Sequence, residues 1–186
     1  IIFLNSNSYG EDNRYFEFDK GIITLMYHRF DEHKYPSTNI QMDIFKEQIN
    51  IIENLDINYL HPKNLKEEIS KPNKVKKILL TIDDGFQSFY DNAWPILKTK
   101  NIPFILFIST AYVGKKGYMN WEQIKEVEES GLGVVGNHSH SHEYLVDKTN
   151  GQIINDINRA IILFEKQLGH SPKYFSYPFG EYSNDF

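Results

Sequence analysis

The segment that most constrains the fold is the stretch Pro-Phe-Ile-Leu-Phe-Ile-Ser over Pro103–Ser109. Its interior is apolar at every position, so it lacks the polar–apolar alternation of a strand with one face in water. A strand buried on both faces is typical of a parallel sheet that helices cover on either side. We therefore expect an α/β fold built on a parallel sheet.

Other apolar segments extend this pattern along the chain. Short apolar runs predict further strands at Gly21–His28, Ile57–His61, Lys77–Asp83, Leu132–Asn137 and Lys173–Tyr177. Helical spacing of apolar residues predicts helices over about 43–55, 89–100 and 153–168, with a helical turn at Leu65–Ile69. The alternation of strand and helix indicates parallel strands joined by helical crossovers, in an open sheet or a barrel.

Local signals mark several boundaries. Asn120 and Gln123 resemble a capping box that opens a helix ending at Gly131. Pro95 lies near the start of the helix over about 89–100 or kinks it. The polar stretch Arg29–Asn39 is predicted to be a loop.

Composition limits the classes of protein to consider. The chain has 186 residues, which suffices for one domain but not for two of ordinary size. Its formal net charge is −5 with scattered Lys and Arg, which disfavours a nucleic-acid partner. Cysteine is absent, which excludes disulfides, thiolate zinc sites and a cysteine nucleophile. No apolar run is long enough to span a bilayer.

The chain divides into an N-terminal extension over residues 1–20, of which residues 5–20 are polar and acidic, and one domain over residues 21–186. Two interpretations fit Ile1–Leu4: the end of a signal peptide's apolar region, or a frayed terminus or first strand. About six predicted strands are fewer than a closed barrel needs, so we expect part of the C-terminal region to be absent.

The first candidate site is Asp83-Asp84-Gly85, at the end of a predicted strand. Such a sequence often forms only a turn, because Asp tolerates turn geometry and Gly supplies positive φ. Adjacent strand residues point to opposite sides, however, so the two carboxylates are expected to have different roles. One can bind a metal while the other faces a substrate.

The second candidate site is the imidazole cluster His138, His140 and His142. A helical turn would put His138 and His142 on one face, whereas an extended segment would align all three. The spacing therefore leaves the ligand pair open, and a His-rich surface loop is the alternative. Imidazole beside carboxylate suits zinc or another divalent transition ion better than magnesium or calcium.

Both candidate sites follow predicted strands, as do His28 and the turn Tyr177–Gly180. In open parallel sheets and in barrels, functional groups gather beyond the carboxyl ends of the strands. The sequence thus predicts that these residues meet at one edge of the sheet.

Thr81–Gly85 and His138–His142 resemble, in order and spacing, the first two motifs of the polysaccharide deacetylase family of carbohydrate esterases. The resemblance spans nearly the whole chain. Its other parts are Tyr27-His28, the helix around Phe45–Ile52, Trp94–Leu97, Trp121 within its helix, and Tyr177–Gly180.

The resemblance implies a fold, a reaction and a set of roles. The fold would be a distorted barrel of parallel strands with outer helices, and the reaction would remove acetyl groups from N-acetylated sugar polymers. Asp83 would be the general base, and Asp84, His138 and His142 would bind a divalent metal, most simply Zn²⁺ with Co²⁺ or Ni²⁺ as alternatives. His140 would not be a ligand.

Two departures from the commonest family pattern refine this expectation. Ser176 stands where that pattern has an arginine that orients the base, and Phe175–Gly180 looks instead like the branch that deacetylates poly-N-acetylglucosamine. The usual late histidine acid is also missing. We expect His28 to be the acid, with a capping or surface role as its alternative, and the backbone N–H of Phe179 to hold the oxyanion.

The expected substrate is a β-linked N-acetylglucosamine polymer, which places the protein outside the cytoplasm. The alternatives are peptidoglycan or chitin oligomers, or a catalytically weak carbohydrate-binding protein. Tyr177 and Trp121 are candidates for stacking on a sugar ring, although a buried Trp is the more usual arrangement. Nothing in the sequence indicates an oligomeric state.

Overall fold

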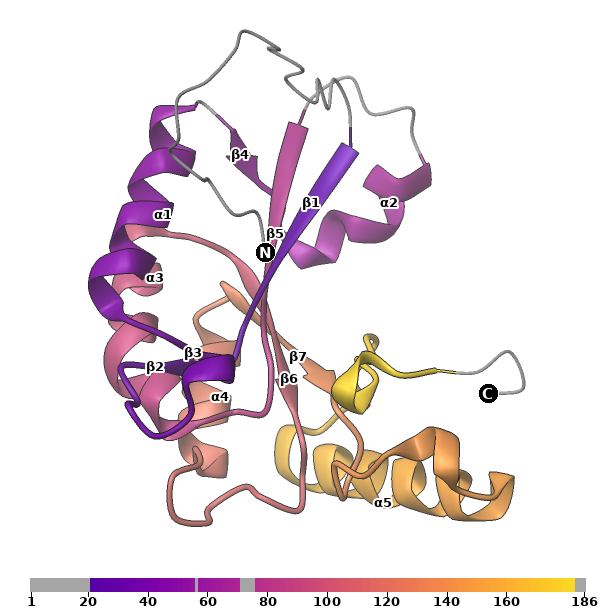
Figure 1. Cartoon of the computed structure of the whole chain (residues 1–186). Helices are drawn as coiled ribbons and strands as arrows, with labels where there is room; N and C mark the ends of the chain where they lie inside the picture. Colours follow the sequence, from indigo (N-terminus) through magenta and orange to yellow (C-terminus); the bar gives the residue numbers. More distant parts are fainter. Residues whose placement is uncertain (1–20, 56, 71–75, 183–186) are drawn as a thin grey trace, which may run out of the picture.

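The computed structural model describes residues 21–55, 57–70 and 76–182 (Figure 1). The expected N-terminal extension over residues 1–20 and the two interpretations of Ile1–Leu4 lie outside these residues. In the described part of the chain, no helix combines the length and the apolar character needed to cross a bilayer.

A five-stranded sheet lies at the centre of the fold, and all of its pairings are parallel. Its strands are β1 (Gly21–Tyr27), β4 (Asn58–Tyr59), β5 (Lys76–Ile82), β6 (Phe104–Ile108) and β7 (Gly133–Asn137). The order is β1-β5-β6-β7, with β4 added beside β5. Because β1 pairs with β5 along its whole length, β4 and β6 share the opposite edge of β5, one at its start and one at its end. The predicted α/β fold with a parallel sheet is confirmed.

The helices cover the sheet and connect its strands. They are α1 (Met42–Asn54), α2 (Leu65–Ser70), α3 (Trp94–Lys100), α4 (Trp121–Glu129) and α5 (Asn150–Leu168). Figure 1 shows α1, α3 and α4 along one side of the sheet and α2 beyond β1 on the other. Each of these overlaps a predicted helix or helical turn, although α3 begins about five residues after the predicted start.

The two faces of the sheet contribute to two separate clusters of buried side chains. Leu80 and Ile82 of β5 belong to the larger cluster, which includes apolar residues of α1, α3, α4 and α5. Leu79 belongs to a smaller cluster with Ile105 and Phe107 of β6. Alternate residues of one strand thus enter different clusters, as the pleat requires, and β6 is buried at all five positions. This burial confirms the expectation for Pro103–Ser109.

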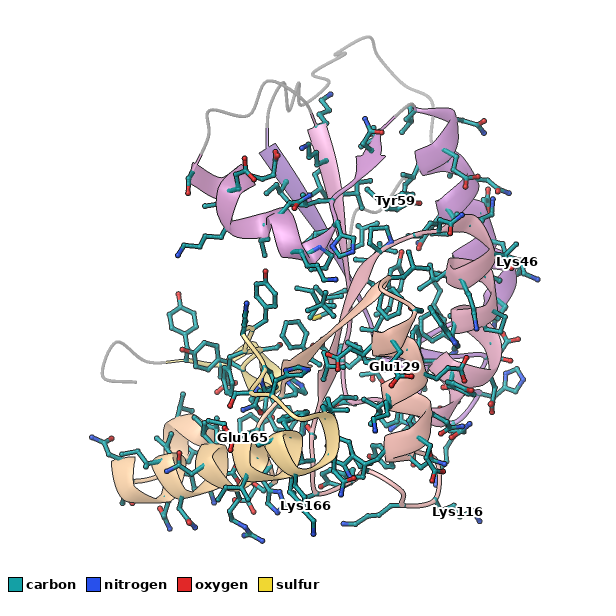
Figure 2. The ribbon with its side chains drawn as sticks, turned by 180° about the vertical axis from the view of Figure 1, so that it is seen from behind. Lys46, Tyr59, Lys116, Glu129, Glu165 and Lys166 are labelled. Carbon is teal, nitrogen blue, oxygen red and sulfur yellow. The ribbon has the colours of Figure 1, made fainter. Side chains whose placement is uncertain are left out.

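Capping signals were accurate guides to helix ends. The Asn120 and Gln123 side chains form the predicted capping box at the start of α4. Gly169 ends α5 in a left-handed conformation with φ of 82°. On α5, Phe164 is buried, whereas Glu165 and Lys166 are exposed (Figure 2). Pro95 lies in the first turn of α3, after a π-helical segment over Phe89–Ala93.

Two predictions about irregular segments were wrong. Lys173–Tyr177 is not a strand, because Phe175 makes only an isolated parallel bridge to Asn137, the last residue of β7. Asn137 ends β7, so Ser176 and Tyr177 have no further residue of that strand to pair with. Arg29–Asn39 is not simply a loop, since β2 (Arg29–Phe30) pairs with β3 (Asn39–Ile40). Strands of two residues carry no periodic signal in the sequence.

Candidate functional site

The carboxyl ends of β5 and β7 carry the candidate site. Asp83 and Asp84 follow β5 directly, and His138 follows β7 directly. One strand, β6, separates them in the sheet, so the two motifs face each other across its end. His142 lies four residues further along the loop that follows β7.

Asp84, His138 and His142 form a triad whose ligand atoms all lie within 4.8 Å of one another. Asp84 Oδ1 lies 3.1 Å from His142 Nε2 and 3.6 Å from His138 Nε2. One carboxylate and two imidazoles are a donor set that suits a divalent transition ion. The residues present therefore fit a single bound metal.

Left-handed backbone conformations shape both ends of the triad. Asp84 has φ of 72° and is followed by Gly85 with φ of 70°. In the loop after β7, Ser139 has φ of 66° and His142 has φ of 54°. Non-glycine residues adopt such angles rarely, and they are found preferentially at functional sites. The chain thus turns sharply where it presents its ligand atoms.

The tautomer of His138 follows from its hydrogen bond. Its Nδ1 lies 2.8 Å from the carbonyl oxygen of Ser176, and a carbonyl only accepts, so Nδ1–H must be the donor. In neutral His138 this leaves Nε2 unprotonated, with its lone pair toward Asp84 Oδ1. Burial lowers the pKa of His138 to about 4, which keeps the ring neutral and able to bind a metal.

The loop between the two histidines is tied to α5. Asp156 of α5 accepts hydrogen bonds from the backbone N–H groups of His140 at 2.7 Å and Ser141 at 3.1 Å. The Nδ1 of His140 instead lies 2.8 Å from Thr110 Oγ1, and His140 is outside the triad. The sequence left the ligand pair open, and the structure brings together His138 and His142. Asp156 was not identified from the sequence, since nothing in its spacing distinguishes it from other polar residues of the helix.

Asp83 differs sharply from its neighbour. It is 3% exposed, and its Oδ1 is buried with no hydrogen-bond partner in the described part of the chain. Its Oδ2 accepts a long hydrogen bond of 3.5 Å from Ser176 Oγ. Burial, and then repulsion by Asp84, raises the pKa of Asp83 to about 7. A carboxylate that has an oxygen without a hydrogen-bond partner and a pKa near neutrality is suited to accept a proton.

His28 lies directly after β1, close enough to Asp84 and His142 for electrostatic interaction with both side chains. Burial lowers the pKa of His28, while the negative charge of Asp84 opposes that shift. The third motif is next to the triad as well. Phe179 has φ of 62°, and its ring centroid lies 4.7 Å from that of His142.

The two aromatic candidates for sugar binding lie in different surroundings. Tyr177 is half-buried near Phe175, with ring centroids 5.1 Å apart. Trp121 begins α4 and packs edge-on against the buried Phe164 of α5, with ring centroids 5.7 Å apart. The role of either residue in substrate binding stays a prediction.

Two pockets meet at His142. One has a volume of about 180 Å³ and is lined by Arg29, Asp84, Phe86, Tyr112, Tyr118 and His142. The other, of about 360 Å³, is lined by His142, Glu143, Tyr144, Asp147, Lys148 and Phe179. In the second pocket the rings of Tyr144 and Phe179 stack at 3.8 Å. A ligand at the triad can therefore extend in two directions.

The metal-free chain should show opposing pH effects from Asp83 and His138. The raised pKa of Asp83, about 7 against 3.8, removes stability as the pH rises through that interval, because the folded state holds the proton more tightly. The lowered pKa of His138, about 4 against 6.5, removes stability as the pH falls through that interval. Between about pH 4 and 6.5 the two effects largely cancel.

Asp83→Asn removes the first effect and leaves the second. At each pH, the free energy of unfolding of the metal-free parent chain is subtracted from that of metal-free Asp83→Asn. This difference should increase by about 2 to 3 kcal/mol between pH 4.5 and pH 6.5. Urea unfolding at both pH values, with a chelator present, measures this difference. A difference that stays constant with pH would show that Asp83 is ionised throughout the interval.

Comparison with known families gives a match to the polysaccharide deacetylase model over residues 70–186. This range includes Asp83, Asp84 and both histidines of the triad. Poly-β-1,6-N-acetyl-D-glucosamine N-deacetylase of Staphylococcus aureus (strain MSSA476) is 28% identical over 164 residues, which cover 79% of this chain and 56% of that protein. The chain thus spans a little over half the length of this relative.

Solved structures show the same fold. IcaB from Ammonifex degensii matches with a TM-score of 0.80 and 30% identity, covering 89% of this chain and 77% of that one. The Streptococcus pyogenes deacetylase PplD matches with a TM-score of 0.78 and 23% identity, covering 88% and 76%. These neighbours confirm the prediction of a distorted barrel of parallel strands. Since the family model covers more than half of the residues, including both motifs that build the triad, this chain belongs to the polysaccharide deacetylase family.

Proposed function

We propose that this chain is a metal-dependent hydrolase that removes N-acetyl groups from a β-linked N-acetylglucosamine polymer. The observation that carries the proposal is the position of Asp83 beside the Asp84–His138–His142 triad: it is a buried carboxylate, and one of its oxygens has no hydrogen-bond partner in the described residues. The name of the staphylococcal relative supports the class of substrate. Because the chain spans 56% of that relative, its own activity has to be measured directly.

The triad would hold one divalent cation, for which we propose Zn²⁺, with Co²⁺ or Ni²⁺ as alternatives. Neutral imidazole and carboxylate are ligands that these ions accept. A cation bound there supplies Lewis acidity and lowers the pKa of a nearby water. All other steps fall to groups of the chain itself.

Asp83 acts as the general base. As a water oxygen attacks the acetamide carbonyl carbon, Oδ1 of Asp83 accepts its proton, and the backbone N–H of Phe179 donates to the developing oxyanion. The carbon–nitrogen bond then breaks, and His28 donates a proton to the departing amine. The reaction requires Asp83 to be ionised and His28 to be protonated. In the metal-free chain, the raised pKa of Asp83 and the lowered pKa of His28 both oppose this combination.

Acetate release from oligosaccharides tests the proposal. The chain is incubated with a β-1,6-linked N-acetylglucosamine pentamer, a chitin pentamer and peptidoglycan, each with Zn²⁺, Co²⁺ or Ni²⁺ and after chelation. We expect metal-dependent acetate release that is fastest with the β-1,6-linked pentamer. Faster release from chitin or peptidoglycan would change the substrate, whereas binding without release would make the chain a carbohydrate-binding protein.

The polymer also indicates where the protein acts. Exopolysaccharides accumulate outside the cytoplasm, so we propose an extracytoplasmic location: periplasmic, cell-surface or secreted. Fractionation of producing cells, followed by detection of the chain in each fraction, tests this. Recovery in the cytoplasmic fraction alone would contradict it.

Asp156 should support metal binding without touching the metal. Asp156→Ala removes the carboxylate that holds the backbone between His138 and His142, so we expect the affinity for Zn²⁺ to fall about 10-fold to 100-fold. Competition with a chromogenic chelator measures the affinity. Asn155→Ala, at the adjacent exposed position of α5, is the matched control and should bind Zn²⁺ as the parent does. Equal affinities for the two variants would show that the loop holds its shape without Asp156.

A further inference from the structure

The helical segment that follows β5 also holds the short strand that follows His28. Ser88 directly precedes the π-helical segment Phe89–Ala93, and Asn92 lies within it. The backbone N–H of Phe30, in β2, donates to Ser88 Oγ at 3.2 Å. Asn92 Nδ2 donates to the carbonyl oxygen of Phe30 at 3.0 Å. Two side chains from one helical segment thus satisfy both polar backbone groups of a single residue.

These contacts replace a neighbouring strand. β2 pairs with β3 along one edge, where the N–H of Asp31 donates to the carbonyl oxygen of Ile40 at 2.9 Å. Successive backbone groups of a strand point to opposite edges, so the groups of Phe30 point away from β3. A buried backbone group without a partner is costly. Within the described residues, Ser88 and Asn92 are the partners that β2 has on its second edge.

The Ser88 hydroxyl has a fixed orientation. It donates its one hydrogen to Glu32 Oε1 at 2.6 Å, so toward Phe30 it acts only as an acceptor. Glu32 is held in turn, because its backbone N–H donates to Asn39 Oδ1 at 2.7 Å. The ring of Phe30 is fully buried, and its centroid lies 5.9 Å from that of Phe89 in the π-helical segment. The main chain and the side chain of Phe30 therefore both contact the same helical segment.

His28 lies between two anchored residues. On one side, the carbonyl oxygen of Tyr27 accepts from the backbone N–H of Asp83 at 2.8 Å. On the other side, the helical segment holds Phe30. Both anchors come from the stretch 83–92, which also carries the proposed base and one ligand of the triad. The position of His28 relative to Asp83 is therefore set from within one short stretch of the chain.

We propose that Ser88 and Asn92 are positioning residues that hold His28 in place to protonate the departing amine. This inference rests on the proposed function, in which His28 is the acid. It has a specific consequence, because proton delivery matters only for a poor leaving group. An amine needs a proton to leave an acetyl carbon, whereas 4-nitrophenolate leaves as a stable anion while Asp83 takes the proton of the attacking water.

Two substrates with different leaving groups test this. In zinc-containing buffer, kcat and KM are measured for Asn92→Leu and Ser88→Ala with the β-1,6-linked N-acetylglucosamine pentamer and with 4-nitrophenyl acetate. For the pentamer, kcat should fall about tenfold to a hundredfold at unchanged KM, as for a slightly misplaced catalytic group. For the aryl acetate, kcat should stay within about twofold of the parent's. Ser88→Thr keeps the hydroxyl and should retain the parent's kcat. Asn158→Leu, at an exposed position of α5, is the matched control.

Amide exchange tests the contacts without turnover. Ser88→Ala removes the acceptor of the Phe30 N–H, so hydrogen–deuterium exchange at Phe30 should become at least about threefold faster relative to the amides of β6. The comparison with β6 corrects for a change in the stability of the whole domain. Asn158→Leu and Ser88→Thr should leave the relative exchange rate at Phe30 as it is in the parent chain.

Each result supports or overturns the proposal. Equal losses of activity on both substrates would show that Ser88 and Asn92 only maintain the fold, and full activity on both would remove them from the reaction. Either result overturns the proposal, as does an unchanged exchange rate at Phe30 in Ser88→Ala. If Asn92→Leu does not fold, Ser88→Ala and Ser88→Thr decide.

Two further results concern the parent chain. If it hydrolyses the pentamer but not the aryl acetate, the comparison is made in His28→Ala, where adding Ser88→Ala should cost less than about twofold in acetate release. A cost as large as in the parent chain overturns the proposal. If the parent releases acetate from no oligosaccharide, the proposed function fails and proton delivery by His28 fails with it. The exchange rates then still show whether Ser88 holds Phe30.

Discussion

Replacing Asp83 by Asn should reduce acetate release by a factor of about 10² to 10⁴, the usual contribution of a general base. The amide keeps the size and shape of the side chain, so packing in the buried position is preserved. It cannot accept the proton of the attacking water, however. The initial rate of acetate release at saturating metal, from the best of the three substrates, measures the loss.

Zinc binding separates this effect from damage to the site. Asp83 is not part of the triad, so Asp83→Asn should bind Zn²⁺ with the affinity of the parent chain. Asp91→Asn, an exposed Asp→Asn change that lies outside the site, serves as the control for the substitution itself. Full activity of Asp83→Asn would remove Asp83 from the mechanism and leave the identity of the base open.

Replacing Asp84 by Ala should abolish stoichiometric zinc binding and, with it, acetate release. The triad would lose its only carboxylate, and two imidazoles would remain, with their ring centroids 4.9 Å apart. We expect the affinity to fall by a factor on the order of 10³ or more, since the binding free energy of a zinc site is shared among few ligands. Metal analysis after dialysis, together with chelator competition, measures the loss.

His140→Ala provides a close comparison for Asp84→Ala. It removes an imidazole from the same loop, but one that contacts Thr110 rather than the triad. The His140→Ala variant should therefore retain one zinc per chain. If His140→Ala loses the metal and Asp84→Ala keeps it, the ligand set proposed here is wrong.

Much of the fold was predictable because it depends on local patterns. Apolar runs located β5 and β6, although Thr81 interrupts the first, and the capping residues of α4 located the start of that helix within one residue. The strand predicted at Lys173–Tyr177 failed for a tertiary reason. Its residues are suited to an extended chain, but the pairing with β7 is limited to one bridge, and β7 has no residue beyond Asn137 to pair with Ser176 and Tyr177.

The candidate site was predictable in its residue types but not in its geometry. Spacing alone could not decide whether His140 or His142 binds a metal together with His138, because it was compatible with both a helical and an extended loop. The structure adopts neither: left-handed residues at Ser139 and His142 break both periodicities, and His140 turns toward Thr110.

Ser176 stands where the commonest family pattern has an arginine, and the structure shows what it contacts instead. Its hydroxyl reaches Asp83 only through a long hydrogen bond, whereas its carbonyl accepts a short one from His138. The sequence showed that an arginine was missing, but backbone contacts cannot be read from side-chain identity. Ser176 therefore contributes to the site mainly through its main chain.

The left-handed residues described above have a consequence for how variants would be selected. Of six non-glycine residues with positive φ in the described chain, four (Asp84, Ser139, His142 and Phe179) lie in or beside the triad. Each such conformation costs on the order of 1–3 kcal/mol. A screen for heat resistance alone would favour glycine or asparagine at Ser139 and Phe179, whereas a screen for turnover would retain the original residues. Comparing the residues that the two screens select would show at which of these positions the left-handed non-glycine residue is needed for turnover.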